Sequence, residues 1–253
     1  MKSEHARFYD RVSPEYDKMT RTRERLPEES RRLEYWLQNY RVKRAVDAGC
    51  GSGLHSLALA SAGVQVTGVD ISDGMIEAAR KNARDLNLPV DWKVGSFEAL
   101  PDLLAEKTDA IFCLGNTLPH LLSEEDQKNS LTAFSKILKP GGLLLLQMLN
   151  YAKVLSHKQR IVAVNRVGTT EFIRFYDFLE NGLQFNLLQI EEREGKLTHR
   201  LESTRLNPIL LKDLEVILPA CGFRIAAIYG NLDRAPFSEK DSPNLVVEAV
   251  VLP

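Results

Sequence analysis

The sequence predicts an α/β protein with a doubly wound, mostly parallel seven-stranded sheet, an antiparallel C-terminal edge strand and a small inserted antiparallel sheet. Three observations lead to this fold class. Helix-like and strand-like segments alternate from about residue 28 onward, which is typical of parallel strands joined by crossover helices. A run of closely spaced glycines follows the first predicted strand. After the fifth strand the alternation stops, and turn signals separate runs of mixed polar and apolar residues.

The predicted elements follow one another in a regular order. The first is a helix over residues 27–40, where Leu33, Trp36 and Leu37 fall on one face at amphipathic spacing. Short apolar runs then predict five buried strands, at residues 44–49, 65–70, 90–96, 109–115 and 142–150. Clear helical spacing between them covers residues 53–63, 73–87 and 124–138.

The segment from residue 160 to 207 differs from the rest of the chain. Turn signals such as Asn181-Gly182 separate runs in which polar and apolar residues mix, and this predicts antiparallel hairpins in a small inserted sheet. The alternative is an extension of the main sheet. Two β-rich runs, residues 223–230 and 244–252, end the chain. No long helix fits between them, so they are expected to pair antiparallel at one sheet edge.

Composition narrows the class of protein. Lys and Arg number 33 against 34 acids, so no net field favours nucleic acid or an anionic membrane. Three cysteines without CxxC spacing argue against disulfides and a zinc site. The charged N-terminus lacks the apolar core of a signal peptide, and the longest apolar run is too short to span a bilayer. We therefore expect a cytoplasmic monomer or homodimer that binds neither nucleic acid nor membrane.

On this basis the chain is predicted to have three parts. Residues 1–43 form an N-terminal helical cap, residues 44–159 and 208–253 form the α/β core, and residues 160–207 form the inserted β lobe. The 253 residues are enough to bury a large core in one domain with an attached lobe.

The stretch VDAGCGSG, residues 46–53, ends the first predicted strand. A strand, a glycine turn and a helix N-terminus together form a site for a nucleotide-like ligand. Leu54 stands where the dinucleotide-binding pattern GxGxxG requires glycine. Asp70 ends the second strand, where a carboxylate can accept both hydroxyls of a ribose. This combination favours a nucleoside without a pyrophosphate.

Three motifs, VDAGCGSG, VTGVDIS and ILKPGGLLLL, together resemble the Rossmann-like, class I S-adenosylmethionine-dependent methyltransferases. The resemblance implies S-adenosylmethionine as cofactor and S-adenosylhomocysteine as its product. It implies that the loop of Gly49, Cys50 and Gly51 passes the methionine part, and that Asp70 binds the ribose.

The same resemblance implies how the adenine is held. Ile71 and Met75 are expected to pack near it. The family often has an aspartate at the end of the third strand for the adenine amino group. This chain has Ser96 followed by Phe97 there, so that contact is expected to be weaker or to come from the backbone.

The segment CLGNTLPHL, residues 113–121, is similar to the one after the fourth strand in glycine and sarcosine N-methyltransferases. The similarity implies that Leu114 and Gly115 touch the cofactor and that Asn116 faces the methyl acceptor. His120 is a candidate catalytic base, and the alternative is that it hydrogen-bonds backbone.

The N-terminal segment resembles the leading helix of related methyltransferases, in which a tyrosine-aspartate pair covers the cofactor. Tyr16 and Asp17 fit that place. The resemblance also implies an arginine that pairs with the methionine carboxylate, as a guanidinium fork does well. An ungapped count selects Arg25, and Arg23 is the rival.

One departure from the glycine enzymes concerns the acceptor. They carry an arginine before asparagine-tyrosine to hold the acceptor carboxylate, and this chain has Leu149 there. Burying a carboxylate beside leucine without a partner is costly, so glycine or sarcosine is not expected as substrate. Asn150 and Tyr151 still offer polar groups and an aromatic face. From the inserted segment, Arg174 and Tyr176 are expected to join them at the acceptor.

The function expected is methyl transfer from S-adenosylmethionine to an N-, O- or S-nucleophile of a small molecule, by in-line displacement. A hydroxyl acceptor requires a base, for which His120 and Tyr151 are the candidate catalytic residues. No acidic cluster follows the fourth strand, so no metal is expected. The alternatives are a cofactor-binding sensor or partner subunit without turnover, and a nicotinamide-dependent oxidoreductase.

Overall fold

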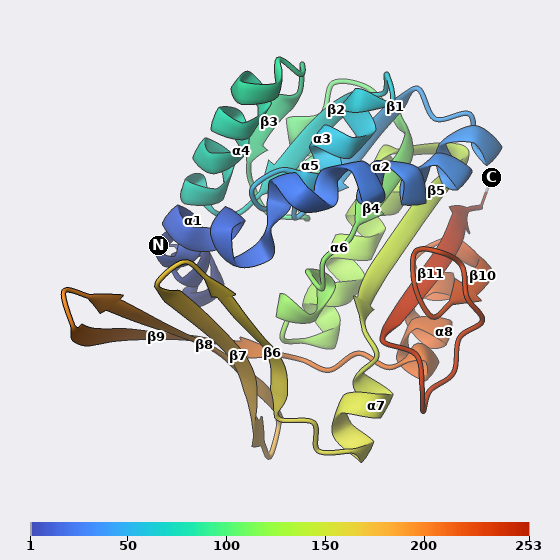
Figure 1. The fold of residues 1–253 in the computed structure, drawn as a ribbon. Coiled ribbons are helices and arrows are strands. Elements are labelled where there is room, and N and C mark those ends of the chain that lie inside the picture. The colour runs from blue at the N-terminus through green and yellow to red at the C-terminus, as the bar shows by residue number, and fades with distance from the viewer. Residues whose placement is uncertain (1, 253) are drawn as a thin grey trace.

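The computed structural model describes residues 2–252, apart from the side chain of residue 193. Its main sheet has seven strands in the order β10-β11-β5-β4-β1-β2-β3 (Figure 1). The strands are β1 (Arg44–Ala48), β2 (Gln65–Asp70), β3 (Asp91–Val94), β4 (Thr108–Cys113), β5 (Leu138–Leu149), β10 (Phe223–Tyr229) and β11 (Asn244–Val251). The first five pair in parallel, as predicted. The expected antiparallel edge pair is confirmed, and β11 lies between β5 and the outermost strand β10.

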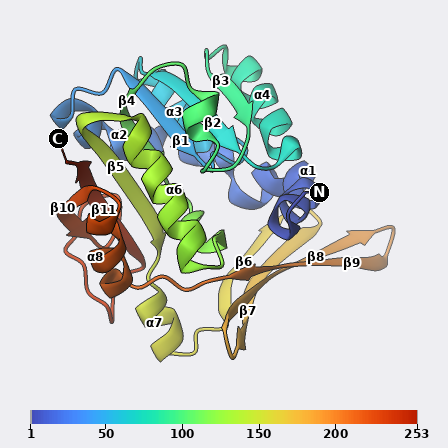
Figure 2. The ribbon, with the colours of Figure 1, turned by 180° about the vertical axis from the view of Figure 1, so that it is seen from behind.

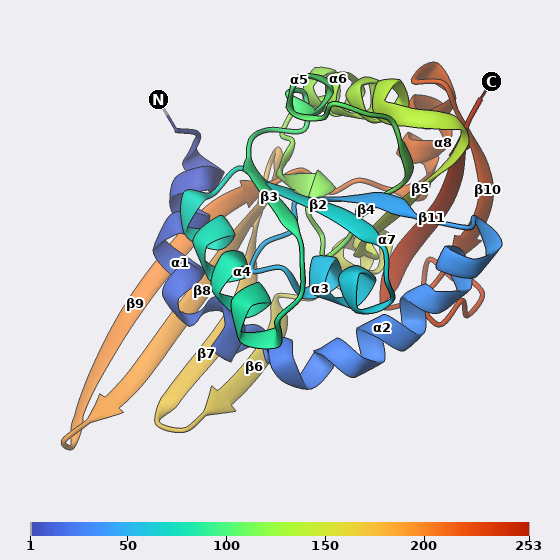
Figure 3. The same cartoon turned by 90° about the horizontal axis from the view of Figure 1, so that it is seen from above.

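Helices cover both faces of this sheet (Figure 3). One face carries α2 (Thr22–Asn39), α3 (Leu54–Ser61) and α4 (Asp73–Leu86), and the other carries α5 (Leu100–Leu103), α6 (Glu124–Ile137) and α8 (Leu211–Ala220). Successive side chains of a strand point to opposite faces of the sheet. In β4, Phe112 packs toward α2 and α3, whereas Ile111 packs toward α6 and α8. The predicted helices are confirmed. The sequence reasoning did not find α8, and α2 begins five residues earlier than predicted, at Thr22 instead of residue 27.

The inserted segment forms a separate antiparallel sheet, which confirms the prediction of hairpins over that of a main-sheet extension. Its strands are β6 (Ile161–Val167), β7 (Thr170–Leu179), β8 (Gly182–Arg193) and β9 (Lys196–Leu206), in that order. The short helix α7 (Tyr151–Ser156) leads into it from β5. Figure 2 shows that the N-terminal helix α1 (Glu4–Thr20) lies against this sheet.

Helix α1 is held between the inserted sheet and the main domain. Its buried Phe8 and Val12 pack with Met75 of α4 and with Phe172 of β7. On the main-domain side, Asp10 accepts hydrogen bonds from the Ser72 hydroxyl and the Gly74 amide at the start of α4, at 2.7 and 3.1 Å. A carboxylate at a helix N-terminus is favoured by the free amides there. The helix therefore crosses the end of the main sheet at which β2 ends and α4 begins.

No helix among residues 2–252 is both long and apolar enough to cross a membrane.

Candidate functional site

The glycine loop after β1 is folded back onto the end of β2. The amides of Gly49 and Cys50 both donate to the carbonyl of Val69, at 2.8 and 3.0 Å. Gly51 has a left-handed backbone with φ of +53°, and its amide donates to the Asp70 carboxylate at 2.8 Å. The loop is thus fixed beside the carboxyl ends of the parallel strands, where α/β sheets bind their ligands.

Asp70 is a buried carboxylate that can accept hydrogen bonds beyond those from the protein. Only 9% of the residue is exposed. Its Oδ2 accepts from the Gly51 amide, and its Oδ1 accepts from the Ser72 amide at 2.9 Å. Burial raises the pKa of Asp70 to about 6, and backbone hydrogen bonds from Ser72, Gly51 and Ile71 oppose that rise. Because each carboxylate oxygen has two acceptor positions, the group keeps acceptor capacity for a ligand. This arrangement suits two neighbouring hydroxyls of one ligand.

The ring of Tyr16 faces the glycine loop from α1. A Cβ placed on Gly51 would lie 3.8 Å from this ring. The next residue, Asp17, accepts a hydrogen bond from the Asn82 amide group of α4 at 2.7 Å. Its second oxygen, Oδ1, is buried and has no partner within residues 2–252. A buried polar atom of this kind is costly unless a ligand or water satisfies it, so Asp17 leaves a polar position open beside the loop.

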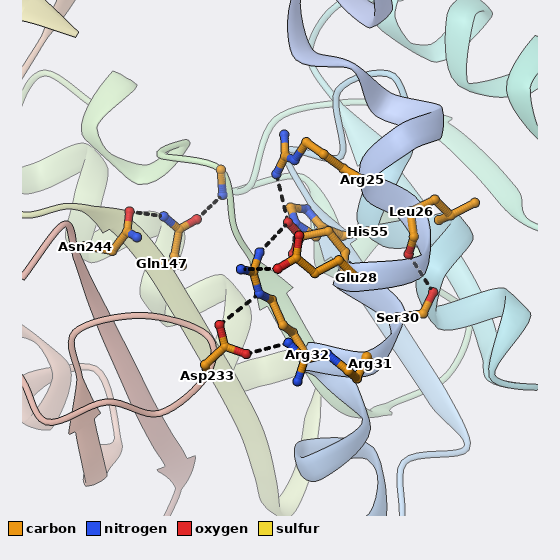
Figure 4. A network of polar contacts seen from close by, with 12 residues as sticks. Arg25, Leu26, Glu28, Ser30, Arg31, Arg32, His55, Gln147, Asp233 and Asn244 are labelled. Carbon is orange, nitrogen blue, oxygen red and sulfur yellow. Dashed lines mark hydrogen bonds and ion pairs between the residues drawn. The ribbon is translucent and has the colours of Figure 1, made fainter. Parts of the chain in front are cut away.

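The structure distinguishes the two candidate arginines. Arg23 is exposed and forms an ion pair with Asp85 on the outer surface of α4. Arg25 donates to Glu29, one turn further along α2, at 3.0 Å, and Figure 4 shows it beside His55 of α3. Burial alone would raise the pKa of Glu29, but hydrogen bonds and charges from His55 and Arg25 lower it to about 2. Arg25 is therefore held near α3, the helix that follows the glycine loop.

Hydrogen bonds involving strands β5 and β11 fix the turn after β4. Leu114 is buried, and Gly115 and Asn116 both have left-handed backbones, with φ of +74° and +69°. The Gly115 amide donates to the Gln147 side chain at 2.6 Å, and Gln147 in turn donates to Asn244 of β11 at 2.9 Å (Figure 4). Because two strands fix this turn, the Asn116 side chain has a defined direction.

A chain of polar side chains starts at Asn116. Its amide group donates to the Tyr151 hydroxyl at 2.8 Å, and its oxygen accepts from the Leu149 amide at 3.0 Å. Tyr151 also lies next to Tyr176 of β7, near enough for each phenol to act on the pKa of the other. Burial raises the pKa of Tyr151 well above its ordinary value and that of Tyr176 to about 12. Both phenols are therefore neutral at physiological pH and act as hydrogen-bond partners.

His120 lies on the short helix η1 (Leu118–His120) and contacts α1. Its Nε2 is hydrogen-bonded to the Tyr9 hydroxyl at 2.8 Å, and its Nδ1 is buried without a partner in residues 2–252. Burial, with a smaller effect from nearby His5, lowers the pKa of His120 to about 3. The imidazole is therefore neutral and a weak base.

The structure corrects the sequence-based expectation for Asn150. Its amide group donates to the carbonyls of Ser238, Glu239 and Ser242, and its oxygen accepts from the Lys153 amide at the start of α7. The side chain is buried and fully used, because it caps a helix and ties down a loop. We therefore do not include Asn150 among the acceptor-binding residues.

The four residues expected near an adenine lie in different surroundings. Ile71 directly follows Asp70 and is half-buried, and Met75 is completely buried under α1. Ser96 is half-buried after β3, whereas the Phe97 ring packs on Phe134 of α6, with ring centres 5.2 Å apart. Their contact with an adenine stays a prediction.

Three polar residues that bind α1 to the rest of the site were not found from the sequence. Tyr9 contacts His120, Asp10 contacts the start of α4, and Asn82 links Asp17 to the Ser52 carbonyl. The only local signal was the FYD spacing at residues 8–10, and nothing in that spacing specifies partners more than 60 residues away.

Comparison with known proteins identifies relatives for both the sequence and the fold. Residues 45–142 match a family described as a methyltransferase domain. The ubiquinone biosynthesis O-methyltransferase of Idiomarina loihiensis is 34% identical over 168 residues, which cover 58% of this chain and 67% of that protein. The glycine/sarcosine N-methyltransferase of Aphanothece halophytica is 36% identical over 119 residues, 47% of this chain and 45% of that protein. The chain thus matches less than half the length of this glycine/sarcosine relative.

Solved structures share the fold over nearly the whole chain. An S-adenosylmethionine-dependent methyltransferase from Clostridium acetobutylicum has a TM-score of 0.81 at 16% identity, covering 97% of this chain and 99% of that one. CalS10, an amino pentose methyltransferase from Micromonospora echinaspora with S-adenosylmethionine bound, has a TM-score of 0.72 at 18% identity, covering 92% and 95%.

Proposed function

This chain belongs to the class I S-adenosylmethionine-dependent methyltransferases, and on that premise we propose that it transfers a methyl group from S-adenosylmethionine to a small-molecule acceptor. The observation that carries the proposal is the placement of Asp70. Its buried carboxylate lies at the edge of a left-handed glycine loop and keeps acceptor capacity beyond the backbone amides that it binds. A carboxylate in this position can accept hydrogen bonds from ribose hydroxyls.

The residues around Asp70 fit the rest of the cofactor. The open Oδ1 of Asp17 and the Tyr16 ring lie where α1 covers the glycine loop, and Arg25 lies beside the helix that follows it. We assign the ribose to Asp70, the methionine carboxylate to Arg25 and the cover to Tyr16. Leu114 is assigned to the floor beneath the reacting end, because it is buried at the end of β4.

When bound, S-adenosylmethionine supplies a methyl group that is already activated for displacement. The protein's task is then to align the acceptor and exclude water, which can lower a barrier by about 7–11 kcal/mol in favourable cases. Asn116 and Tyr151 are hydrogen-bonded to each other, and together with the neighbouring Tyr176 they form a polar wall that can orient an acceptor. Neutral His120 and the neutral phenols are weak bases, so an amine or a thiolate needs less assistance here than a hydroxyl.

Several relatives support a small-molecule acceptor. Their names refer to glycine and sarcosine, to ubiquinone biosynthesis and to amino sugars. Leu149, which cannot clamp a carboxylate, directly precedes Asn150 and Tyr151 in this chain. We therefore propose that no acceptor carboxylate is held at Leu149, the position that holds it in the glycine enzymes, and that the protein is a cytoplasmic monomer or homodimer.

Turnover tests this proposal. The protein is incubated with S-adenosylmethionine labelled on the methyl group and with a panel of small amines, phenols, thiols and amino sugars. Label transferred to at least one panel member, with release of S-adenosylhomocysteine, is the expected result. Tight cofactor binding without transfer to any member would instead favour a sensor.

Removal of the Tyr151 hydroxyl should separate catalysis from cofactor binding. Tyr151→Phe removes the hydroxyl that is hydrogen-bonded to Asn116 and lies next to Tyr176. Such a hydrogen bond is worth about 0.5–1.5 kcal/mol, so kcat/KM should fall by up to about tenfold. Cofactor affinity should stay unchanged, because Asp70 and the glycine loop are intact. The control is Tyr35→Phe, which removes a hydroxyl on the exposed side of α2. Equal loss in both variants would exclude Tyr151 from the acceptor site.

Cofactor affinity should depend on the protonation of Asp70. Because its pKa in the free protein is raised to about 6, the carboxylate is protonated below that pH and then accepts hydroxyl hydrogen bonds less well. Affinity for 5′-methylthioadenosine, which keeps the ribose and lacks the titrating amino-acid part, should fall as the pH is lowered from 7.5 to 5. The raised pKa also means that Asp70 contributes stability to the free protein below pH 4 and loses it as the pH rises through 6. Titration with 5′-methylthioadenosine at several pH values checks the pH dependence of the affinity. Asp70→Asn should lack that dependence.

A further inference from the structure

Arg174 is a cation on an otherwise apolar wall. On β7 the side chains of Phe172, Arg174 and Tyr176 point to the same face, because side chains alternate along a strand. Phe172 and Tyr176 are each 1% exposed, and Leu187 is paired with Arg174 across the sheet and is 5% exposed. This is the face of the small sheet that packs against α1.

Within the described part of the chain, the guanidinium of Arg174 is unpaired. None of residues 2–252 accepts a hydrogen bond from Arg174 or forms an ion pair with it, and its Nε is completely buried. Burial lowers the pKa of Arg174, with the positive charge of Arg25 acting in the same direction. The residue as a whole is half-buried, so part of the guanidinium stays accessible while its Nε is enclosed. An enclosed donor without an acceptor is costly, and an anionic ligand at the accessible side would supply that acceptor.

The surroundings of Arg174 indicate which ligand that is. Tyr176, two residues along the same face, lies next to Tyr151, which is hydrogen-bonded to Asn116. Arg174 thus stands at the end of the polar chain that we assign to the acceptor. Arg174 is also near enough to Tyr16 and Arg25 for their charges to act on its pKa. The difference is that Arg25 is already hydrogen-bonded to Glu29, whereas Arg174 has no such partner in residues 2–252.

We propose that Arg174 binds a carboxylate of the methyl acceptor, so that the substrates of this protein are small organic acids that also carry the methylated nucleophile. This inference rests on the proposed function. A single guanidinium fork matches one planar carboxylate through two parallel hydrogen bonds. The positive charge that would hold the carboxylate comes from Arg174 on the inserted sheet, because Leu149 at the end of β5 is uncharged. The acid group of the acceptor therefore points toward β7 and its nucleophile toward Asn116.

Anion binding tests the inference without knowledge of the natural substrate. The wild-type protein, saturated with S-adenosylhomocysteine, is titrated with acetate and acetamide and with benzoate and benzamide at constant ionic strength. At least one acid should bind about tenfold more tightly than its neutral amide, because charge-assisted hydrogen bonds are roughly twice as strong as neutral ones. Arg174→Gln should abolish the preference. Arg166→Gln removes an exposed arginine of the neighbouring strand β6 and should keep it.

Two further measurements separate the competing explanations. If Arg174 instead held the methionine carboxylate, Arg174→Gln would weaken S-adenosylhomocysteine but not 5′-methylthioadenosine, and the acceptor assignment would be wrong. Arg174→Met should leave the Tm of the unliganded protein equal to or above that of the wild type, because an uncompensated charge is removed. A Tm several degrees lower would make Arg174 a structural residue and overturn the proposal.

The failure of each proposal gives a different result. Wild-type protein that does not bind S-adenosylhomocysteine contradicts the proposed function itself. Wild-type protein that binds it, yet shows no preference for either acid over its amide, contradicts only the assignment of Arg174. A preference that survives in Arg174→Gln contradicts that assignment as well.

Discussion

Replacing Asp70 with asparagine should weaken the binding of S-adenosylmethionine by about tenfold or more while the protein stays folded. Hydrogen bonds to a charged acceptor are worth about 1.5–3 kcal/mol each, and two are expected from the ribose. Asparagine keeps the shape but has one accepting oxygen, and its amide group would face either the Gly51 or the Ser72 backbone amide, which is itself a donor.

The control for this variant is Asp73→Asn. Asp73 lies three residues further on, in the first turn of α4, where it is exposed and paired with Lys2. Asp73→Asn removes the same negative charge as Asp70→Asn at nearly the same place in the chain. Calorimetry should give normal affinity for the Asp73 variant and weak affinity for the Asp70 variant. Normal affinity in a folded Asp70→Asn protein would show that the ribose is bound elsewhere.

Gly51→Val should abolish cofactor binding. The added side chain would point into the space between the glycine loop and Tyr16, where a Cβ already lies 3.8 Å from the ring. Valine has two more carbons beyond that Cβ, and they would occupy the path that we assign to the methionine part of the cofactor. The backbone at Gly51 is left-handed, so the variant also carries strain of about 1–2 kcal/mol.

Gly63→Val separates the steric effect from this strain. Gly63 is also left-handed, with φ of +83°, but nothing lies within 4 Å of a Cβ placed there, and it follows the far end of α3. Both variants should therefore lose similar thermal stability. Only the Gly51 variant should lose binding. Loss of binding in both would mean that strain, and not the blocked path, is the cause.

The parts of the site that were predicted from the sequence depend on local patterns. The glycine loop follows strand β1 and Asp70 is the last residue of strand β2, and parallel strands bring their carboxyl ends to the same edge. The inserted sheet was found for a similar reason, because its turns and alternation are visible within each hairpin. Periodicity over a few residues is sufficient for both.

Other parts depend on tertiary geometry that no local pattern contains. The choice between Arg23 and Arg25 depends on the direction in which α2 leaves the left-handed residue Arg21, which ends α1. The contact of Tyr9 with His120 joins residues 111 apart. A count along the sequence could not decide either point.

Asn150 shows a different kind of error. Its position next to Tyr151 suggested a ligand-binding amide, but asparagine is also a preferred helix N-cap, and here the N-cap role of α7 explains it. Helix α8 was missed because its segment is mostly apolar and resembles a buried strand in composition.

The central claim is that the glycine loop, Asp70 and α1 form a site for S-adenosylmethionine. Calorimetric titration of the wild-type protein with S-adenosylmethionine, and in parallel with NAD, tests it most directly. We expect saturable binding of S-adenosylmethionine, lost in Gly51→Val and weakened in Asp70→Asn, and no binding of NAD. Binding of NAD in place of S-adenosylmethionine, or S-adenosylmethionine binding that neither variant changes, would contradict the claim.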